Sequence, residues 1–340
     1  MFSMLLVPFV IAMFLAINMG GSGTAPSFSA AYGSNIIKKN MIPGIFGIFV
    51  FLGAIIAGEN VAKTIGGSIV PSEAMTITLG TIILLSVSLS LLIANLLKVP
   101  QSTSQATITA LVGPAVYYNI IQTNKLFYEI IPTWFILPII SFLITYLIGR
   151  FLYNPLNKRK TVNFVEISEH RLLKVFALCA ACYVAFAIGS NNVANASGPI
   201  ASIVSNELNI KSEDSNFLLV MILATLVTAP CFAIGSSIFG KGVTRTIGKD
   251  IIGFGPLGAS LISVVTATLL IVASLSRGIP TSLVQMNTLA IMGLGVSKVG
   301  WRAILFKAST KKLLIVWIIS PVISFSLSFT LTVIADKIGL

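Results

Sequence analysis

The chain has 340 residues, of which 56% are hydrophobic and only 9% are charged. Soluble domains carry about 25% charged residues, so the composition excludes a protein with a fully water-facing surface. The net charge of +12 lies in the connectors between apolar runs, which is typical of orientation in a membrane and argues against a nucleic-acid partner. Runs of roughly 20 apolar residues cross lipid only as helices, so we expect an all-α integral membrane protein in contact with the lipid bilayer.

Chemically reactive side chains are scarce. The three cysteines, Cys179, Cys182 and Cys231, lie in apolar stretches, and the single histidine, His170, lies in a polar connector. The Cys-x-x-Cys pair has no second pair of ligands, and no two carboxylates share an apolar stretch. We therefore expect no catalytic residue, no metal and no cofactor, and we rank a membrane enzyme acting on phosphorylated lipid last.

Apolar stretches recur ten times and form two sets of five. A basic connector, residues 150–172, separates a first repeat, 1–149, from a second repeat, 173–340. If each stretch crosses once with the N-terminus outside, only five basic residues lie outside, namely Lys63, Lys125, Lys211, Arg277 and Lys337. This bias predicts a multi-pass protein of the cell membrane with both termini outside. The stretches cover residues 2–36, 42–58, 75–97, 100–121, 126–149, 173–204, 216–240, 251–275, 279–297 and 313–334.

The two sets share motifs at a nearly constant offset. G-x4-G-x2-V starts at Gly53 and again at Gly235, and P-x-S-x2-Q starts at Pro100 and again at Pro280. The two spacings are nearly equal, so both pairs belong to one alignment of the two sets. Because each set has five crossings, the second enters from the opposite side, so the sequence predicts inverted-topology repeats, in which secondary transporters hold substrate near the midplane. We assign the motif glycines themselves to close helix packing.

Two of the stretches exceed one crossing and contain glycine-rich polar patches. The first patch extends from Asn18 to Ser27, and the second from Gly189 to Pro199. Glycine and proline favour unwound backbone, which is tolerated at membrane depth only beside a cavity or within protein. We expect broken helices there, with new helix N-termini that attract an anion through free N–H groups and the helix dipole.

Proline and hydroxyl groups also begin the fourth stretch of each set, at Pro100 and Pro280. Four helix N-termini would then meet near the midplane, surrounded by hydroxyls and amides without a carboxylate. Any single Ser or Thr is as well explained by a helix cap, so only the complete set indicates a site. Whether 100–121 and 279–297 cross fully or form re-entrant hairpins stays open. The predicted substrate-binding residues are Ser22, Thr24, Ser27, Ser102, Thr103, Ser104, Gln105, Asn191, Asn192, Asn195, Thr281, Ser282 and Gln285.

At these patches the sequence resembles the inorganic phosphate transporter (PiT) family. That family repeats a G-A-N-D-V-A-N-[SA]-F-G motif in each half and carries P-x-S-T-T-H helices. Residues Gly189 to Gly198 read G-S-N-N-V-A-N-A-S-G and match the first motif closely, whereas residues 20–34 match it weakly. P-Q-S-T-S-Q, from Pro100 to Gln105, matches the second motif, and the copy at Pro280 matches only partly. The resemblance covers nearly the whole chain and implies transport of an inorganic oxyanion.

The chain departs from the family at the ionisable positions of both motifs. The motif aspartate falls on Gly23 and Asn192, and the motif histidine falls on Gln105. In the family, these aspartates are implicated in handling sodium and phosphate. Sodium favours anionic oxygen ligands, and protonated phosphate needs an acceptor, whereas sulfate needs donors only. The substitutions therefore favour sulfate, and they look like those of the sulfate permease branch of the family.

We thus expect a secondary-active oxyanion transporter that takes up sulfate together with protons. Import of a dianion against a negative interior costs about 2.3 kcal/mol per charge per 100 mV, so a cation must accompany it. Glu59 and Glu129 are the nearest candidates for proton coupling, although carboxylates at span ends are unremarkable. The alternatives are a sodium- or proton-coupled phosphate symporter and, more remotely, a passive anion channel. The chain could also form a homodimer.

Overall fold

The computed structural model describes residues 2–33, 36–97, 101–155, 170–210, 215–250, 255–305 and 308–340. Every regular element within these ranges is helical. In chain order the elements are α1 (Phe2–Gly33), η1 (Lys39–Met41), α2 (Ile42–Ala57), α3 (Glu59–Gly67), η2 (Ser72–Ala74), α4 (Ile77–Leu96), α5 (Thr103–Tyr117), α6 (Thr123–Lys125), η3 (Leu126–Ile130), α7 (Ile131–Ile148), η4 (Gly149–Tyr153), α10 (Arg171–Asn192), α11 (Ala194–Glu207), α12 (Ser215–Asp250), α13 (Pro256–Arg277), α14 (Leu283–Val299), α15 (Trp301–Leu305) and α16 (Ala308–Lys337).

Eight helical segments of the described chain are long and apolar enough to cross a membrane, so the prediction of an all-helical, multi-pass protein is confirmed. Ten crossings are not confirmed. Helices α5 and α14 fall on the predicted fourth stretches, but their 15 and 17 residues are fewer than the roughly 20 that one crossing needs. The eight segments are Met4–Phe28, Lys39–Ala57, Ile77–Leu96, Thr123–Leu152, Arg171–Glu207, Asn216–Gly240, Pro256–Arg277 and Trp317–Lys337.

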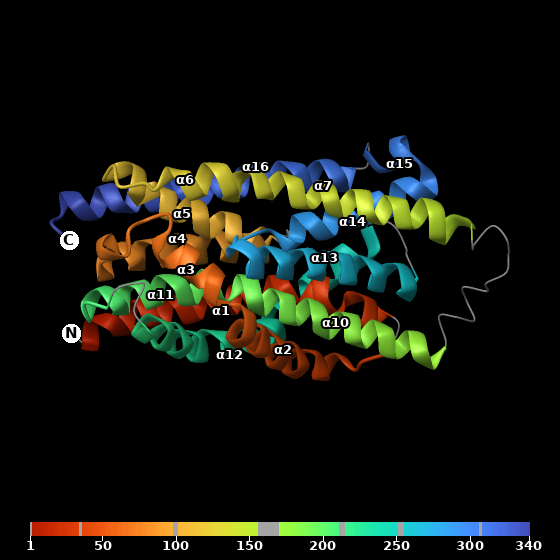
Figure 1. Cartoon of the computed structure of the whole chain (residues 1–340), viewed down its shortest axis with the longest axis horizontal. Helices are drawn as coiled ribbons and strands as arrows, with labels where there is room; N and C mark the ends of the chain where they lie inside the picture. Colours follow the sequence, from red (N-terminus) through yellow and green to blue (C-terminus); the bar gives the residue numbers. More distant parts are fainter. Residues whose placement is uncertain are drawn as a thin grey trace.

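The long helices follow the long axis of the molecule, and both chain termini lie at the same end, which we call the termini end (Figure 1). Helix α5 extends from the middle toward the termini end, whereas α14 extends toward the opposite end, which we call the far end (Figure 1). Helix α5 packs against α4, and α14 packs against α13. The two pairs form hairpins, and the described residues of their turns, 101–102 and 279–282, are buried.

Helices α1 and α12 pack so closely at two glycines that no side chain fits between their backbones. A Cβ atom added at Gly20 would overlap the carbonyl oxygen of Phe232 on α12. Likewise, a Cβ atom added at Gly235 of α12 would overlap the carbonyl oxygen of Ile17 on α1. Helices in lipid gain little from hydrophobic burial, so this close approach stabilises the pair through dispersion contacts instead.

Helices α2 and α10 make a contact of the same form. A Cβ atom at Gly53 would overlap the carbonyl oxygen of Phe186, and one at Gly189 would overlap the carbonyl oxygen of Val50. The assignment of the motif glycines to helix packing is confirmed at Gly53 here and at its counterpart on α12. Each of these two contacts joins a helix from the first half of the chain to one from the second.

The predicted helix breaks in the glycine-rich patches are corrected by the structure. Helix α1 continues through Asn18–Ser27, so the unwinding expected there is wrong. The contact with α12 holds this part of α1, and local glycine preference does not overcome that tertiary packing. In the second patch α10 ends at Asn192 and α11 begins at Ala194, but Val193 keeps right-handed helical angles of φ −59° and ψ −35°. The interruption is one residue, not an unwound segment.

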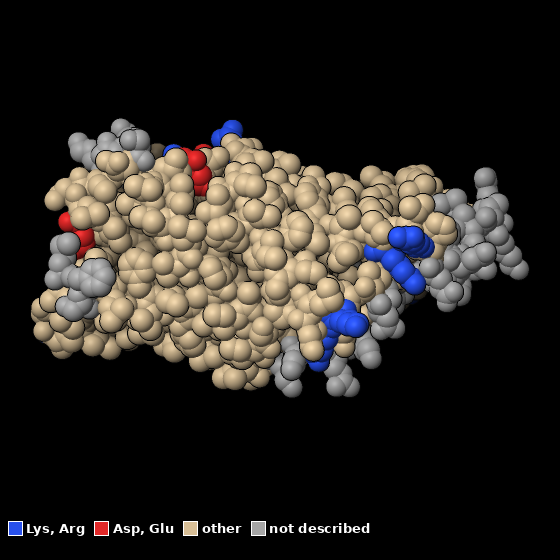
Figure 2. All heavy atoms as spheres, turned by 90° about the horizontal axis from the view of Figure 1, so that it is seen from below, with Lys and Arg blue, Asp and Glu red and all other residues tan. Residues whose placement is uncertain are grey.

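Charge is distributed unevenly between the two ends. On the face drawn in Figure 2, Asp and Glu atoms lie in the half that holds the termini, and the two largest Lys and Arg patches lie toward the far end. The far end holds the end of α7, the start of α10 and α15 (Figure 1). Basic residues in or next to these elements are Arg150, Arg171, Lys174 and Arg302. This is the separation that the charge bias of the connectors predicts.

Candidate functional site

Two short helices begin inside the molecule, one from each hairpin. Ser102 precedes α5 in an extended conformation, and its Oγ accepts a hydrogen bond from the Gln105 backbone N–H (3.3 Å). Ser282 caps α14 in the same way and accepts from the Gln285 N–H (3.2 Å). The predicted helix starts at these two positions are confirmed. The N–H groups of a first helical turn have no carbonyl of their own helix to bond, so they can donate to a ligand.

A pair of buried glutamines joins the two helix starts. Gln105 Nε2 donates to Gln285 Oε1, and Gln285 Nε2 donates to Gln105 Oε1, both at 3.0 Å. Each glutamine is the third residue of its helix. The N-termini of α5 and α14, which extend toward opposite ends of the molecule, therefore meet at a closed amide pair.

Asn191, in the last turn of α10, connects this pair of helix starts to the body of the protein. Its Nδ2 donates to Ser274 Oγ (2.9 Å) and to the Ile279 carbonyl (3.0 Å). Its Oδ1 accepts from the Thr281 backbone N–H (3.0 Å) and from Ser104 Oγ (3.4 Å). The side chain is fully buried, so each of these bonds satisfies a group that water cannot reach.

One turn after Asn191, Asn195 of α11 donates from Nδ2 to Ser104 Oγ (3.3 Å). The hydrogen-bonded residues at the two helix starts form what we call the polar cluster. Thr103 and Asn192 are buried next to it in the chain. The polar cluster comprises Ser102, Ser104, Gln105, Asn191, Asn195, Thr281, Ser282 and Gln285.

Three buried oxygen atoms in or beside the polar cluster have no hydrogen-bond partner among the described residues. They are Asn192 Oδ1, Asn195 Oδ1 and Thr281 Oγ1. Buried polar atoms without partners are rare, because each forfeits the hydrogen bonds it would make in water. Asn192 Oδ1 and Asn195 Oδ1 can only accept hydrogen bonds, whereas Thr281 Oγ1 can also donate one, so water or a ligand that carries a donor would satisfy all three.

The three predicted residues on α1 do not bond to the polar cluster. The hydroxyls of Ser22, Thr24 and Ser27 each donate to a backbone carbonyl of their own helix, at 3.0, 2.7 and 2.9 Å. Thr24 also lies against Gly240 of α12. The expectation that a helix N-terminus forms at Ser22–Thr24 is wrong, since α1 is continuous and its N–H groups there are inside the helix.

The two predicted coupling carboxylates lie outside the polar cluster. Glu59 begins α3 and accepts a hydrogen bond from Lys63 (2.6 Å), and it lines a small crevice that reaches Val193. Glu129 in η3 lies 3.8 Å from Lys125 Nζ and 3.6 Å from Arg277 Nη1. Within the described chain, neither carboxylate bonds to a residue of the cluster.

Two buried polar residues that join neighbouring elements escaped the sequence analysis. Ser274 of α13 accepts the hydrogen bond from Asn191, and Asn95 of α4 donates to the Asn18 carbonyl of α1 (2.9 Å). Each is a lone small polar residue near the end of an apolar stretch. Such a residue has no motif or spacing that distinguishes it from a local helix-bonded side chain.

Where the structure describes side chains, the buried polar ones are hydroxyls and amides only. Among the same residues, no Asp, Glu, Lys or Arg is buried. Hydroxyl, amide and backbone N–H groups donate hydrogen bonds to an oxyanion, and none of them repels it as a carboxylate would. The site is therefore suited to a ligand that accepts hydrogen bonds.

Apolar spans around a buried core of hydrogen-bond donors define a multi-pass membrane protein of the transporter class. Residues 19–328 match the Phosphate transporter family. The chain is 34% identical over 328 residues to the sulfate permease CysP of Bacillus subtilis (strain 168), covering 96% of this chain and 86% of that protein. The chain belongs to the phosphate transporter family, so the resemblance carried by the motifs is confirmed.

A solved structure, "The sodium-dependent phosphate transporter", has the same fold. It aligns with a TM-score of 0.83 at 20% identity, covering 99% of this chain and 100% of that one. The family, the relative and this structural neighbour are transporters or permeases, which are not enzymes.

Proposed function

We propose that the protein is a secondary-active transporter that imports sulfate. The observation that carries this proposal is the polar cluster, where two helix N-termini and several amides and hydroxyls converge without a carboxylate. Sulfate near neutral pH is a bare dianion that accepts hydrogen bonds and donates none, so a donor-rich, uncharged lining suits it. The 34% identity to a sulfate permease supports the same substrate.

Phosphate is the second candidate, and one observation favours it. Near neutral pH phosphate still carries a proton, which needs an acceptor. Asn192 Oδ1 and Asn195 Oδ1 are buried acceptors without a partner in the described chain, and either could take that proton. The name of the structural neighbour also points to phosphate.

We further propose that residues 1–149 and 173–340 are inverted repeats joined by the connector 150–172. The glycine contacts support this, because one correspondence relates both of them. In each contact, a glycine on one helix lies against the residue three positions before the glycine on the other helix. The α1 residues of the first contact correspond to the α10 residues of the second, and the α12 residues of the first correspond to the α2 residues of the second. In this topology α5 and α14 are the short arms of hairpins that enter from opposite sides of the membrane, and an alternating-access cycle exposes the polar cluster to each side in turn.

The termini end, in this proposal, faces outward, and the far end faces the cytoplasm. The Lys and Arg patches at the far end support this orientation, because cytoplasmic connectors of membrane proteins are enriched in basic residues.

Protons are the proposed coupling ion, with Glu59 as the coupling carboxylate. Its crevice is lined by Gly189, Val193 and Ser197, so it reaches the α10–α11 interruption beside Asn192. A proton carried there would offset part of the charge of the dianion. Glu59→Gln should abolish uptake driven by a proton gradient and spare sulfate–sulfate exchange, whereas Glu73→Gln, on the exposed η2 turn, should change neither.

The proposal is tested by uptake of labelled sulfate into proteoliposomes that contain the full chain. We expect accumulation above the external concentration when an inward proton gradient is applied without sodium. Unlabelled sulfate should compete better than phosphate, molybdate or thiosulfate. Sodium-driven phosphate uptake without sulfate competition would replace the substrate and the coupling ion, and uptake that never exceeds equilibrium would indicate a passive channel.

A further inference from the structure

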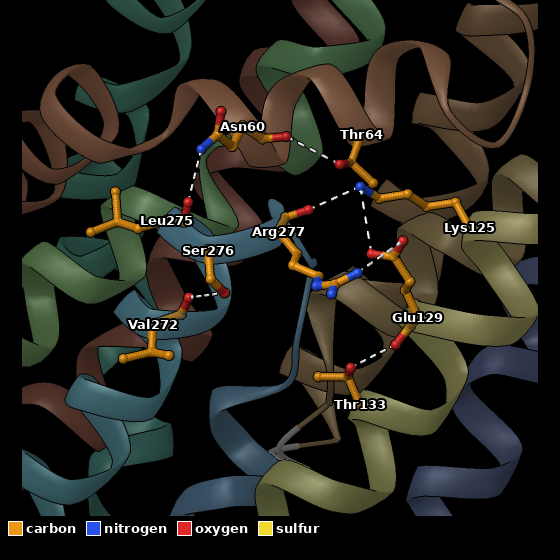
Figure 3. Close-up of polar contacts among 9 residues, drawn as sticks. All are labelled: Asn60, Thr64, Lys125, Glu129, Thr133, Val272, Leu275, Ser276 and Arg277. Carbon is orange, nitrogen blue, oxygen red and sulfur yellow. Dashed lines mark hydrogen bonds and ion pairs between the residues drawn. The ribbon is translucent and has the colours of Figure 1, made fainter.

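The turn of the α13–α14 hairpin is fastened to segments of the first half of the chain. We call residues 275–280 the hairpin tip. Asn60 Nδ2 of α3 donates to the Leu275 carbonyl (3.1 Å), and Lys125 Nζ of α6 donates to the Arg277 carbonyl (2.9 Å). Trp134 Nε1 of α7 donates to the Pro280 carbonyl (2.9 Å). Figure 3 shows the tip at Leu275–Arg277 held between Asn60 on one side and Lys125 and Glu129 on the other.

These donors replace bonds that a helix end lacks. The last carbonyls of α13 have no N–H partner within the helix, and the negative end of its dipole lies there. Asn60 and Lys125 supply two of the missing donors, and the Lys125 ammonium also places a positive charge at this helix end. Gly278, at φ 61°, turns the chain directly after the helix, and a Cβ there would overlap the Asn60 carbonyl oxygen.

Glu129 holds the two cations of this arrangement together. Its carboxylate lies 3.6 Å from Arg277 Nη1 and 3.8 Å from Lys125 Nζ, and its Oε2 has no hydrogen-bond partner in the described chain. These separations exceed hydrogen-bond distance, so the contact is one of charge rather than of fixed geometry. The Arg277 side chain is 67% exposed and that of Glu129 is 29% exposed. Exposed ion pairs of this kind contribute little energy each, so the contact can break during turnover.

The tip continues directly into the polar cluster. Ile279 bonds to Asn191 through its carbonyl, and Thr281 and Ser282 belong to the cluster itself. Any displacement of the tip therefore moves the N-terminus of α14 and its cap.

The hydrogen bonds that fasten the tip have no counterpart among the described residues of the α4–α5 hairpin. The pattern W-x3-P-x2-S runs from Trp134 in α7 and recurs in the second half of the chain from Trp317 in α16. Trp134 bonds to the tip, but the buried Trp317 Nε1 has no partner among the described residues. When the two patterns are aligned, alanine and lysine replace Lys125 and Glu129, so the aligned positions do not repeat this arrangement of charges.

We propose that Glu129 is a positioning residue for transport: together with Lys125 and Trp134 it holds the hairpin tip closed toward the termini end, and the tip must be released for the polar cluster to open there. This inference rests on the proposed transport function for its role in the cycle. It assigns Glu129 to holding the tip, and leaves Glu59 as the proposed proton carrier.

The test measures access to the tip without requiring transport. Ile279, which is buried, is replaced by cysteine in a full-length chain whose native cysteines are alanine. A membrane-impermeant thiol reagent is then added on the termini side of sealed vesicles. We expect Glu129→Gln to raise the modification rate by about two- to fivefold, as for the loss of an exposed ion pair. Trp134→Phe, which removes a partly buried hydrogen bond, should raise it by roughly tenfold. Trp317→Phe and Glu73→Gln are the matched controls and should leave the rate unchanged.

Two further measurements keep the inference falsifiable. Glu129→Asp, which retains the charge, should restore slow modification, and thermal unfolding should show that every variant remains folded. Arg277→Gln combined with Glu129→Gln should be no faster than the faster single variant, because both remove one shared contact. An unchanged rate in folded Glu129→Gln overturns the inference. Absent sulfate uptake in the wild type, with these rate changes intact, overturns the proposed function and leaves the role of Glu129 in holding the tip.

Discussion

Gln105 and Gln285 lie in different halves of the chain and exchange two hydrogen bonds of 3.0 Å, each amide donating to the oxygen of the other. A glutamine amide carries donors and an acceptor, so the pair is self-complementary when no ligand is bound. An anion that enters between the two helix starts competes for the donors only. Under the proposed function, the pair keeps two Nε2 groups in position for sulfate, and its two mutual hydrogen bonds break when sulfate binds.

Removing either glutamine should weaken transport by a similar amount. We expect Gln105→Ala and Gln285→Ala each to raise the KM for sulfate by roughly tenfold, since hydrogen bonds to charged groups contribute about 1.5–3 kcal/mol. The double variant should lose less than the product of the two, because the residues share one contact. Uptake kinetics in proteoliposomes measure all three. Strictly multiplicative effects would show that the two side chains act separately.

Asn191→Ala should lower both stability and transport. The variant leaves the Thr281 N–H and the Ile279 carbonyl without their partner inside the protein, which costs about 1–3 kcal/mol for such unsatisfied groups. Asn206→Ala on α11 is the control, since that side chain makes one partly buried bond, to the Met75 carbonyl. Thermal unfolding in detergent, with and without sulfate, separates the two variants. If the two variants lost equal amounts of stability and transport, Asn191 would be no more important than Asn206.

Asn192→Asp tests the electrostatic argument for substrate choice. A carboxylate beside the polar cluster should repel sulfate and provide an acceptor for the proton of phosphate. We expect the ratio of sulfate to phosphate uptake to fall by roughly tenfold or more, as for one unscreened unfavourable charge contact. Asn192→Gln keeps the side chain neutral and serves as the control. Unchanged sulfate affinity in the aspartate variant would contradict the argument.

Gly235→Ala should destabilise the α1–α12 pair, because its Cβ would overlap the Ile17 carbonyl oxygen. Forcing a methyl group into such a contact costs about 1–3 kcal/mol. Gly44→Ala is the matched control: a Cβ there meets nothing within 4 Å, so alanine should be neutral or slightly stabilising in helix α2. Monodispersity and thermal unfolding in detergent distinguish the two. A Gly235→Ala protein as stable as the control would rule out the close backbone contact.

The helix starts at the candidate site could be predicted from the sequence because they depend on local chemistry. The starts of α5 and α14 followed from Pro and Ser at matching positions, because an N-cap depends on one side chain and its own backbone. The prediction of unwound backbone in helix α1 was wrong because its conformation depends on a distant part of the chain. Among the glycines that suggest unwinding there, Gly20 is required by the contact with Phe232 on a helix from the other half of the chain, and no local signal reveals that partner.

The residues of the candidate site also divide into those that the sequence could predict and those that required the fold. Ser104, Gln105 and Asn191 were found because they lie in motifs, and they do converge. Thr24 and Ser27 also lie in a motif but bond within α1, since a hydroxyl on a continuous helix is satisfied by its own backbone. Ser274, which completes the environment of Asn191, stands alone in an apolar stretch and could be identified only once the helices were placed.

Because α5 and α14 aim their positive ends at one point from opposite directions, their positive electrostatic potentials add between them, while their opposed dipoles largely cancel at a distance. An anion held there is attracted alike from both sides, so this pair of helices cannot act as a rectifier. Directionality has to arise elsewhere, either in the ion that travels with the substrate or in the unequal fastening of the two turns that bring these helix ends together.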